Sequence, residues 1–334
     1  MPKTTLSDLA KICEVDISTV SRALRGDPRV KASSQQRIRE AAERLGYRPN
    51  LLARNLAGGK TRTLWIIMPS VDAAPDYRLI RAASHMANER DYSLFVALHD
   101  CDNYGAMEGH SIAHYEQIVS QAAQGLTDGV IILPRRHESD VNILSELVHH
   151  KIPMVFADNF VPELPIPVVT SDNQPAAAEL ARRCAEYGVD EAVLLFPEPN
   201  PVARARMAGA REAFQKAGIP VHNRSDLPEN WQPAKNPSRM AILSSHQDYL
   251  HRFAVRQEAH LKNKQLVFGV FDDWTGEPSP AQQVIIAVQD NQELARQSVD
   301  ILIRRIENPK SCQTDALHHT VPIAEFRTLS LNFN

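Results

Sequence analysis

The stretch LSDLAKICEVDISTVSRALRG, residues 6–26, carries two short apolar stripes at helical spacing with a break between them. The stripes consist of Leu6, Leu9, Ala10, Val20, Ala23 and Leu24. Residues 13–15 interrupt the period, and Asp16 is a good N-cap for a second helix, which we expect over residues 17–25. Two short helices joined by a tight turn are typical of a helix-turn-helix, whose second helix fits the major groove of DNA.

The outward face of the second helix has side chains that suit DNA. Ile17 offers an apolar contact for a thymine methyl group, Ser18 and Ser21 offer hydroxyl groups, and Arg22 suits guanine or phosphate. A helical hairpin with one surface arginine explains the same pattern equally well. A third helix should follow, capped by Ser33 or Ser34.

A further short helix is expected within residues 47–60, after Pro49 and before Gly58 and Gly59. Its apolar face is narrow, and an isolated helix of this length is marginal in water. We therefore expect it to become ordered only against a partner and DNA.

Charge is distributed unevenly along the 334 residues, whose net charge is -3. Residues 1–62 hold 13 Lys and Arg against 6 Asp and Glu, whereas the remainder holds 24 against 34. A basic head on an acidic body is expected when only the head approaches phosphate. No apolar run approaches the roughly 20 residues of a membrane span, and the start lacks the apolar stretch of a secretory signal.

The four cysteines, Cys13, Cys101, Cys184 and Cys312, share no metal-ligand spacing. We expect reduced thiols in a cytoplasmic chain, with no metal and no cofactor.

From Thr63 onward, short apolar runs alternate with helical stretches, which predicts parallel sheets with helices on both faces. The expected strands are 63–69, 93–98, 129–133, 154–157, 167–170, 192–196, 241–244, 266–271 and 284–288. The expected helices are 77–90, 112–124, 141–149, 176–187, 203–217 and 292–307. Residues 221–239, rich in Pro and Asn, indicate a loop. The length exceeds one comfortable sheet, so we expect two lobes.

The chain resembles the lactose-repressor/galactose-repressor (LacI/GalR) family of bacterial transcription regulators. The resemblance is dense at residues 5–6, 8–10, 15, 19–24, 30, 45–50 and 53–56, and weaker at 127–132, 152–155, 206–209, 269–273 and 293–295. It implies an N-terminal all-α helix-turn-helix head plus hinge helix, and a C-terminal α/β two-lobed periplasmic-binding-protein-like effector domain with parallel sheets. The expected boundaries are 1–49 for the head, 50–62 for the hinge helix and linker, and 63–334 for the effector and dimerisation domain.

The resemblance also implies the residues that contact DNA. They are Thr5, Leu6, Ile17, Ser18, Thr19, Ser21, Arg22, Asn50, Ala53, Arg54, Leu56 and Ala57. In the family, the hinge helix pairs with that of its dimer mate in the minor groove, where Leu56 would wedge open a base step. Two departures stand in the turn. Asp16 replaces a common serine, and Glu14 replaces a glycine, which costs on the order of 1 kcal/mol where φ is positive.

The candidate effector site lies beyond the carboxyl ends of the parallel strands, where such sheets bind ligands. The candidates are Asp72, Tyr77, Asp100, Asp158, Arg206, His246, Asp272 and Trp274. Carboxylates and an arginine can hold sugar hydroxyls, with Tyr77 or Trp274 stacking on a ring. The resemblance implies that Arg206 and Asp272 contact the effector, whereas helix-start and loop-cap roles explain Asp72, Asp100, Asp158 and His246 equally well. Ser245-His246 replaces the family's Asn-Asp pair, and Arg206 with His246 would tolerate an anionic ligand.

Enzyme classes lack their signatures in this sequence. The first predicted strand is not followed by the glycine-rich turn of a dinucleotide-binding fold, and no phosphate loop or nucleophile elbow is present. We expect a DNA-binding repressor of carbohydrate or related metabolic genes, with no enzymatic activity and no membrane partner. It would act as a homodimer, or a tetramer, on a pseudo-palindromic operator and respond to a sugar or sugar phosphate. The alternative is a cytoplasmic ligand-binding protein of periplasmic-binding-protein type without enzymatic activity.

Overall fold

The structure is a computed structural model, which describes residues 4–24, 26–47, 60–71, 74–99, 108–134, 137–196, 200–223, 239–261, 264–272, 274, 280–309 and 317–331. The chain divides into two compact units, Met1–Thr61 and Arg62–Asn334, which we call the head and the body and describe separately. None of the helices in the described ranges is long and apolar enough to cross a membrane.

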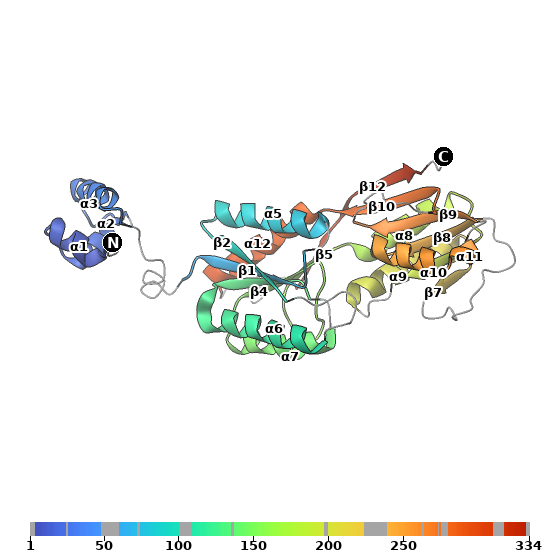
Figure 1. The fold of residues 1–334 in the computed structure, drawn as a ribbon, viewed down its shortest axis with the longest axis horizontal. Helices are drawn as coiled ribbons and strands as arrows, with labels where there is room; N and C mark the ends of the chain where they lie inside the picture. Colours follow the sequence, from blue (N-terminus) through green and yellow to red (C-terminus); the bar gives the residue numbers. More distant parts are fainter. Residues whose placement is uncertain are drawn as a thin grey trace. The chain divides into compact units, whose positions relative to one another are not determined.

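The described part of the head contains α1 (Leu6–Ile12), α2 (Ile17–Leu24) and α3 (Ala32–Arg44) (Figure 1). Leu9, Val20 and Ile38, one from each helix, are fully buried and form the centre of a small core. This confirms the two apolar stripes and the third helix expected from the sequence.

The expected cap of α3 is wrong. The helix begins before Ser33, with Lys31 at the N-cap and no side-chain cap bond. The carbonyl of Lys31 accepts the N–H groups of Ser34 and Gln35, and the Gln35 side chain donates to the carbonyls of Asp27 and Val30. Because Gln35 ties the preceding turn to the helix, the first helical turn starts earlier than a serine cap would place it.

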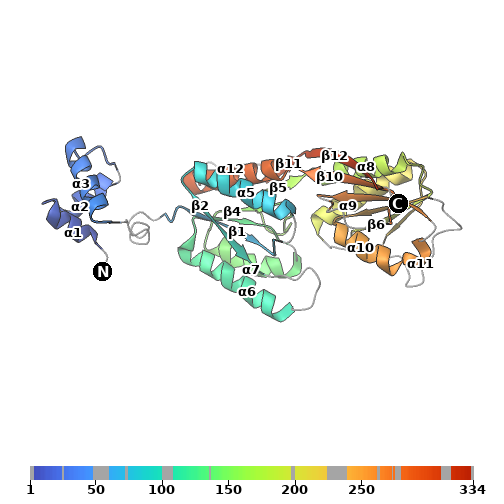
Figure 2. The same ribbon diagram turned by 45° about the horizontal axis from the view of Figure 1, so that its top comes forward.

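The body contains two six-stranded sheets, each in its own lobe. Lobe 1 has β1 (Thr63–Met68), β2 (Ser93–Leu98), β3 (Gly129–Ile132), β4 (Met154–Ala157), β5 (Val168–Ser171) and β11 (His318–Val321), in the order β11-β5-β4-β3-β1-β2 with parallel pairing throughout. On one face lie α5 (Ala74–Glu89) and α12 (Asn291–Glu307); on the other lie α6 (Glu108–Gln121), η1 (Ala122–Leu126) and α7 (His137–His149) (Figures 1 and 2). Alternate residues of β1 serve the two faces: Ile66 packs with α5 and α12, whereas Ile67 packs with α6 and α7.

Lobe 2 repeats this arrangement. Its strands are β6 (Glu191–Leu195), β7 (Val221–Asn223), β8 (Arg239–Ser244), β9 (Gln265–Phe271), β10 (Gln283–Gln289) and β12 (Ile323–Ser330), in the order β12-β10-β9-β8-β6-β7. The pairs are parallel except β10 with β12, which is antiparallel. The helices α8 (Asn173–Ala185) and α9 (Pro201–Lys216) cover one face, and α10 (Gln247–Arg256) and α11 (Glu258–Leu261) pack on the other.

The sequence correctly places nine strands, with ends that differ by at most two residues from those observed. It misses β7, β11 and β12, and β7 corrects the expectation of a loop throughout residues 221–239. These are edge strands with mostly exposed or half-buried residues, so they lack the continuous apolar run that marks the central strands.

The chain crosses between the lobes three times. It crosses from β5 to α8, from β10 to α12, and from β11 to β12. As a result α12 follows a strand of lobe 2 yet buries Leu294, Val299 and Leu302 in the core of lobe 1. Residues at the carboxyl ends of β5 and β10 therefore lie where the two lobes join.

Candidate DNA-binding face and effector site

The outward face of α2 has the composition expected of a recognition helix. Ile17 is 50% exposed, and Ser18 and Arg22 are also exposed. Thr19 and Ser21 are half-buried at the margins, while Val20 and Ala23 are buried on the opposite face. An exposed isoleucine beside a hydroxyl group and an arginine leaves both apolar and polar groups available to base edges.

The turn before α2 contains Glu14 with φ 49, inside the left-handed region that glycine adopts freely. The expected positive φ at this position is confirmed. A non-glycine residue costs on the order of 1 kcal/mol there, so the turn carries local strain.

Thr5 and Leu6 are engaged within the head. Thr5 is the N-cap of α1: Asp8 N–H donates to Thr5 Oγ1 (3.3 Å), and Asp8 Oδ2 accepts from Thr5 N–H (2.9 Å) and Thr5 Oγ1 (2.7 Å). These hydrogen bonds, from the side chain and backbone of Thr5, lower the pKa of Asp8. Leu6 is half-buried against the core of the head. The predicted DNA contacts Asn50, Ala53, Arg54, Leu56 and Ala57 lie outside the described residues, as do the effector candidates Asp72 and Asp100.

A buried polar cluster connects the two lobes at their crossings. Arg206 on α9 is only 3% exposed, and its guanidinium lies 3.8 Å from the centroid of the Phe271 ring. Arg206 Nε donates to Asn173 Oδ1 (2.7 Å), and Arg206 Nη2 donates to Gln289 Oε1 (3.2 Å). Since Asn173 begins α8 and Gln289 ends β10, Arg206 connects two of the three crossings.

Gln289 extends this network to both lobes. Its Oε1 also accepts a hydrogen bond from the hydroxyl of Ser171, the last residue of β5 (2.6 Å). Its Nε2 donates to Asp272 Oδ1 (2.5 Å). Ser171, Gln289 and Asp272 are all less than a tenth exposed. We call Ser171, Asn173, Arg206, Asp272 and Gln289 the hinge cluster.

Asp158 and Asp272 occupy equivalent places in the two lobes. Asp158 follows β4 with φ 65, and Asp272 follows β9 with φ 76. Each donates its N–H to the neighbouring strand, Asp158 to Val169 O (2.8 Å) and Asp272 to Ala287 O (2.9 Å). Aspartate in the left-handed region costs energy, and such strain is concentrated at functional sites.

The charge of Asp272 depends on its surroundings. Burial raises its pKa, and the nearby Asp158 carboxylate raises it further, while Arg206, His246 and the hydrogen bond from Gln289 act in the opposite direction. Asp158 Oδ1 is buried and makes no hydrogen bond. The structure thus brings four of the eight effector candidates together: Asp158, Arg206, His246 and Asp272.

Among the described interactions, neither of the two aromatic candidates contacts the hinge cluster. Trp274 is 8% exposed and packs in the core of lobe 2, stacked on His251 at 5.2 Å and edge-on to Phe268 at 6.2 Å. In this position its ring faces are not available to a ligand. Tyr77, on α5, is 60% exposed.

Three residues of the hinge cluster were not predicted from the sequence: Ser171, Asn173 and Gln289. A repeated signal was present, because Asp-Asn-Gln follows the last strand residue at two crossings, at 172–174 and 290–292. In both cases the aspartate occupies the N-cap of the helix that enters the other lobe.

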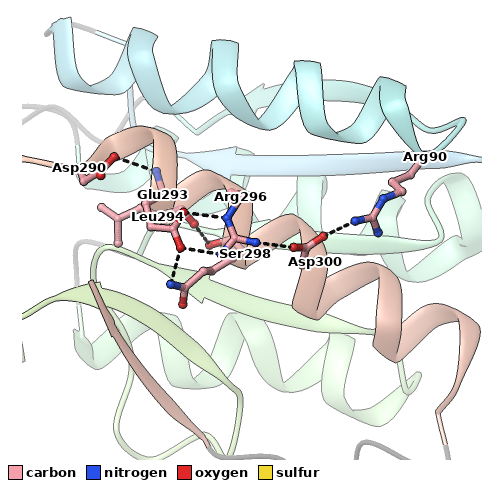
Figure 3. A network of polar contacts seen from close by, with 8 residues as sticks. Arg90, Asp290, Glu293, Leu294, Arg296, Ser298 and Asp300 are labelled. Atoms are coloured by element: carbon pink, nitrogen blue, oxygen red, sulfur yellow. Dashed lines mark hydrogen bonds and ion pairs between the residues drawn. The ribbon is translucent and has the colours of Figure 1, made fainter. Parts of the chain in front are cut away.

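The second of these helices, α12, carries a chain of ion pairs along its own surface that ends at Arg90 of lobe 1 (Figure 3). Asp290 Oδ1 caps the helix by accepting from Glu293 N–H (2.9 Å). Arg296 pairs with Glu293 (2.6 Å) and with Asp300 (2.9 Å), and Asp300 also pairs with Arg90 (2.8 Å), just after α5. Hydrogen bonds from Arg296, and secondarily from Gln297, lower the pKa of Glu293 to about 2.

Known proteins are similar to this chain in sequence, both within the head and over a longer stretch. Residues 5–50 match the family model "Bacterial regulatory proteins, lacI family". The HTH-type transcriptional repressor CytR of Escherichia coli (strain K12) is 30% identical over 218 residues, which cover 65% of this chain and 61% of that protein. Catabolite control protein A of Priestia megaterium is 28% identical over 222 residues, covering 66% and 63%. The matched part of the chain thus spans less than two thirds of the length of these relatives.

Solved structures share the fold across the chain. The crystal structure of the lac repressor dimer bound to operator and the anti-inducer ONPF has a TM-score of 0.71 at 17% identity, covering 98% of both chains. The Cra transcriptional dual regulator from Pseudomonas putida, in complex with fructose 1-phosphate, has a TM-score of 0.62 at 18% identity, covering 80% of this chain and 98% of that one. The helix-turn-helix head and the two-lobed body with parallel sheets are thereby confirmed. The head, over residues 5–50, thus matches the lacI family of bacterial regulatory proteins, and the body has the fold of solved transcriptional regulators.

Proposed function

We propose that the chain is a sequence-specific DNA-binding transcriptional regulator that represses carbohydrate or related metabolic genes. The exposed face of α2, in a head that matches the lacI family model, is the observation that carries this proposal. A binding protein of periplasmic type has no use for such a face, so the alternative function is not favoured. The relative CytR carries the name of a transcriptional repressor, which supports a non-enzymatic role in the cytoplasm.

On DNA, α2 enters the major groove, where Ile17, Ser18 and Arg22 reach bases and phosphate. A homodimer places two heads on a pseudo-palindromic operator; the similar lac repressor structure is a dimer bound to operator. The boundaries 1–49, 50–62 and 63–334 and the minor-groove role of Leu56 remain predictions of this proposal.

The effector binds between the lobes, against the hinge cluster, and is a sugar or sugar phosphate. Asp158 comes from lobe 1, while Arg206 and Asp272 come from lobe 2, so one ligand that contacts all three depends on the angle between the lobes. Similar structures contain cellobiose and fructose 1-phosphate. The carboxyl groups of Asp158 and Asp272 beside the Arg206 guanidinium, which is bonded to Asn173 and Gln289, offer groups that can hold sugar hydroxyls.

Ligand binding would act on DNA affinity through the crossings. Ser171 and Gln289 end the strands that lead into the other lobe, so a ligand bonded to Arg206 or Asp272 shifts the balance between lobe angles. A coupling free energy of about 1–3 kcal/mol would change operator affinity roughly 5–150-fold.

The test begins with selection of duplexes from a random library by the purified full chain. The expected product is a pseudo-palindromic site whose affinity falls with salt and is lost in the Arg22→Ala variant. Ser33→Ala, on α3, is the matched control and should bind normally. Sugars and sugar phosphates are then screened for a change in operator affinity in the parent chain and in Asp158→Asn. Selection of no sequence, or an unchanged response in Asp158→Asn, would contradict the DNA-binding and effector parts of the proposal respectively.

A further inference from the structure

Lobe 1 contains a concave site at the end of the lobe that lies opposite the hinge cluster. It is a cavity of about 240 Å³ whose wall is apolar, formed by Val148, Ile152, Met154 and Ile166 with three prolines, and whose charged residues are Lys151 and Arg305. Met154 begins β4, whereas Asp158 follows the end of that strand. Arg305 is in the last turn of α12, and the 17 residues of this helix span about 25 Å. The cavity therefore shares no residue with the hinge cluster and lies far from it.

The two cations of this cavity have no anionic partner in the part of the chain that the structure describes. Arg305 is half-buried, and within the described ranges neither Arg305 nor Lys151 makes a side-chain hydrogen bond or an ion pair. Among the described residues that line the cavity, none is acidic. The adjacent Arg304 is exposed and already places a positive charge at the carboxyl end of α12, where the helix dipole favours one. A bound anion would give the Arg305 guanidinium the charge partner that it lacks among the described residues.

The backbone at Lys151 gives an independent indication. Lys151 has φ 55 just after α7, where its N–H donates to Val148 O and the next N–H donates to Leu147 O. The equivalent position is a glycine with positive φ after α8 and after α9, Gly188 and Gly218, and an aspartate with φ 59 after α5, Asp91. Lysine thus occupies a conformation that costs on the order of 1 kcal/mol and that glycine would adopt freely. The side chain at the rim of the cavity offers a reason for this strain.

We propose that this cavity binds a small amphipathic carboxylate, with its apolar body against Val148, Met154 and Ile166 and its carboxylate between Arg305 and Lys151. The guanidinium can accept a carboxylate in bidentate geometry, with the lysine as a second charge. A cavity of about 150 Å³ holds benzene, and drug-sized pockets begin at about 300 Å³. The intermediate volume here fits one aromatic ring, or a chain of similar size, with a short acid group.

The experiment is calorimetric titration of the full chain with phenylacetate and, as the uncharged match, phenylacetamide. Phenylacetate should bind at least about tenfold more tightly than the amide, since a hydrogen bond to a charged group is worth at least that factor. The variants Arg305→Gln and Lys151→Gly should each bind phenylacetate about tenfold more weakly than the parent chain. Lys151→Gly removes the charge while relaxing the backbone, so unfolding cannot explain its loss of binding. Arg304→Gln is the matched control and should bind as the parent does.

Equal affinity for the acid and the amide, or unchanged affinity in Arg305→Gln, would overturn the assignment. So would the absence of binding at millimolar concentration by phenylacetate, 3-phenylpropionate and hexanoate together. Neither result bears on the proposed effector site, because Arg206 and Asp272 take no part in this cavity.

Discussion

Replacing Gln289 with leucine keeps the approximate size of the side chain and removes every hydrogen bond that its amide makes in the hinge cluster. The lost bonds join Gln289 to Ser171 (2.6 Å), Arg206 (3.2 Å) and Asp272 (2.5 Å). All three partners are buried, so water cannot replace the amide without opening the junction between the lobes. The Gln289→Leu variant therefore isolates the energy of the cluster.

The magnitude follows from the buried groups left unpaired. A buried donor or acceptor without a partner costs about 1–3 kcal/mol, and more where the group is charged. The three costs do not add fully, since they belong to one network and Arg206 keeps its bond to Asn173. We expect the free energy of unfolding of the body to fall by about 3–5 kcal/mol.

A second variant at this position tests the electrostatics. Gln289→Glu keeps an acceptor for Ser171 and Arg206 but faces Asp272 with a second carboxyl group, which bonds to it only if one of the two is protonated. The pKa of Asp272 is already raised by burial, and the new charge would raise it further. The loss of stability caused by Gln289→Glu should therefore be largest at high pH, and it should shrink as the pH falls through the raised pKa of Asp272.

Urea unfolding of the full chain, followed by tryptophan fluorescence at pH 8 and pH 5.5, measures both effects. Gln292→Leu is the control, because Gln292 is exposed in the first turn of α12 and should change stability by no more than about 0.5 kcal/mol. The expectation is contradicted if Gln289→Leu costs as little as the control, or if the destabilisation by Gln289→Glu does not shrink as the pH is lowered.

Three further predictions follow from local geometry. Glu14→Gly should raise the thermal stability of the isolated head by about 1 kcal/mol, since φ is 49 there, and a destabilised variant would contradict the strain. Gly209→Ala should destabilise the body by more than about 2 kcal/mol, because its Cβ would lie 2.0 Å from Gln174 O, whereas Ala208→Gly on the same helix should cost only about 1 kcal/mol in urea unfolding. Glu293, whose pKa is lowered to about 2, stabilises the fold above its usual pKa of 4.5, and this contribution is lost as the pH falls toward 2. Between pH 5 and 3, the free energy of unfolding of Glu293→Gln should therefore fall less than that of the parent chain, with a difference below about 1 kcal/mol. Identical pH profiles of the two chains would exclude the effect.

Much of the fold could be predicted from local patterns in the sequence. The stripes at Leu9, Val20 and Ile38 identified the helices of the head, because helical period and burial on one side are properties of neighbouring residues. The central strands were found for the same reason, as short apolar runs covered on both faces. The positive φ of Glu14 followed from the resemblance to a family that has glycine there.

Only part of the candidate effector site could be predicted from the sequence. Arg206 and Asp272 could be named from the family resemblance, and the equivalence of Asp158 and Asp272 follows from two sheets of like topology. By contrast, the sequence did not indicate that Trp274 packs on His251 in the core of lobe 2, since tertiary packing decides where an aromatic ring lies.

The sequence by itself determined the helix-turn-helix with its exposed Ile17 and Arg22, and the alternating strands and helices of the body, because each depends on residues within a few positions of one another. Only the tertiary structure decided the hinge cluster, in which Ser171 and Gln289 meet across 118 positions and Arg206 and Gln289 across 83. Three crossings of the chain bring these side chains together, and no local pattern records which distant strand ends will share one buried hydrogen-bond network.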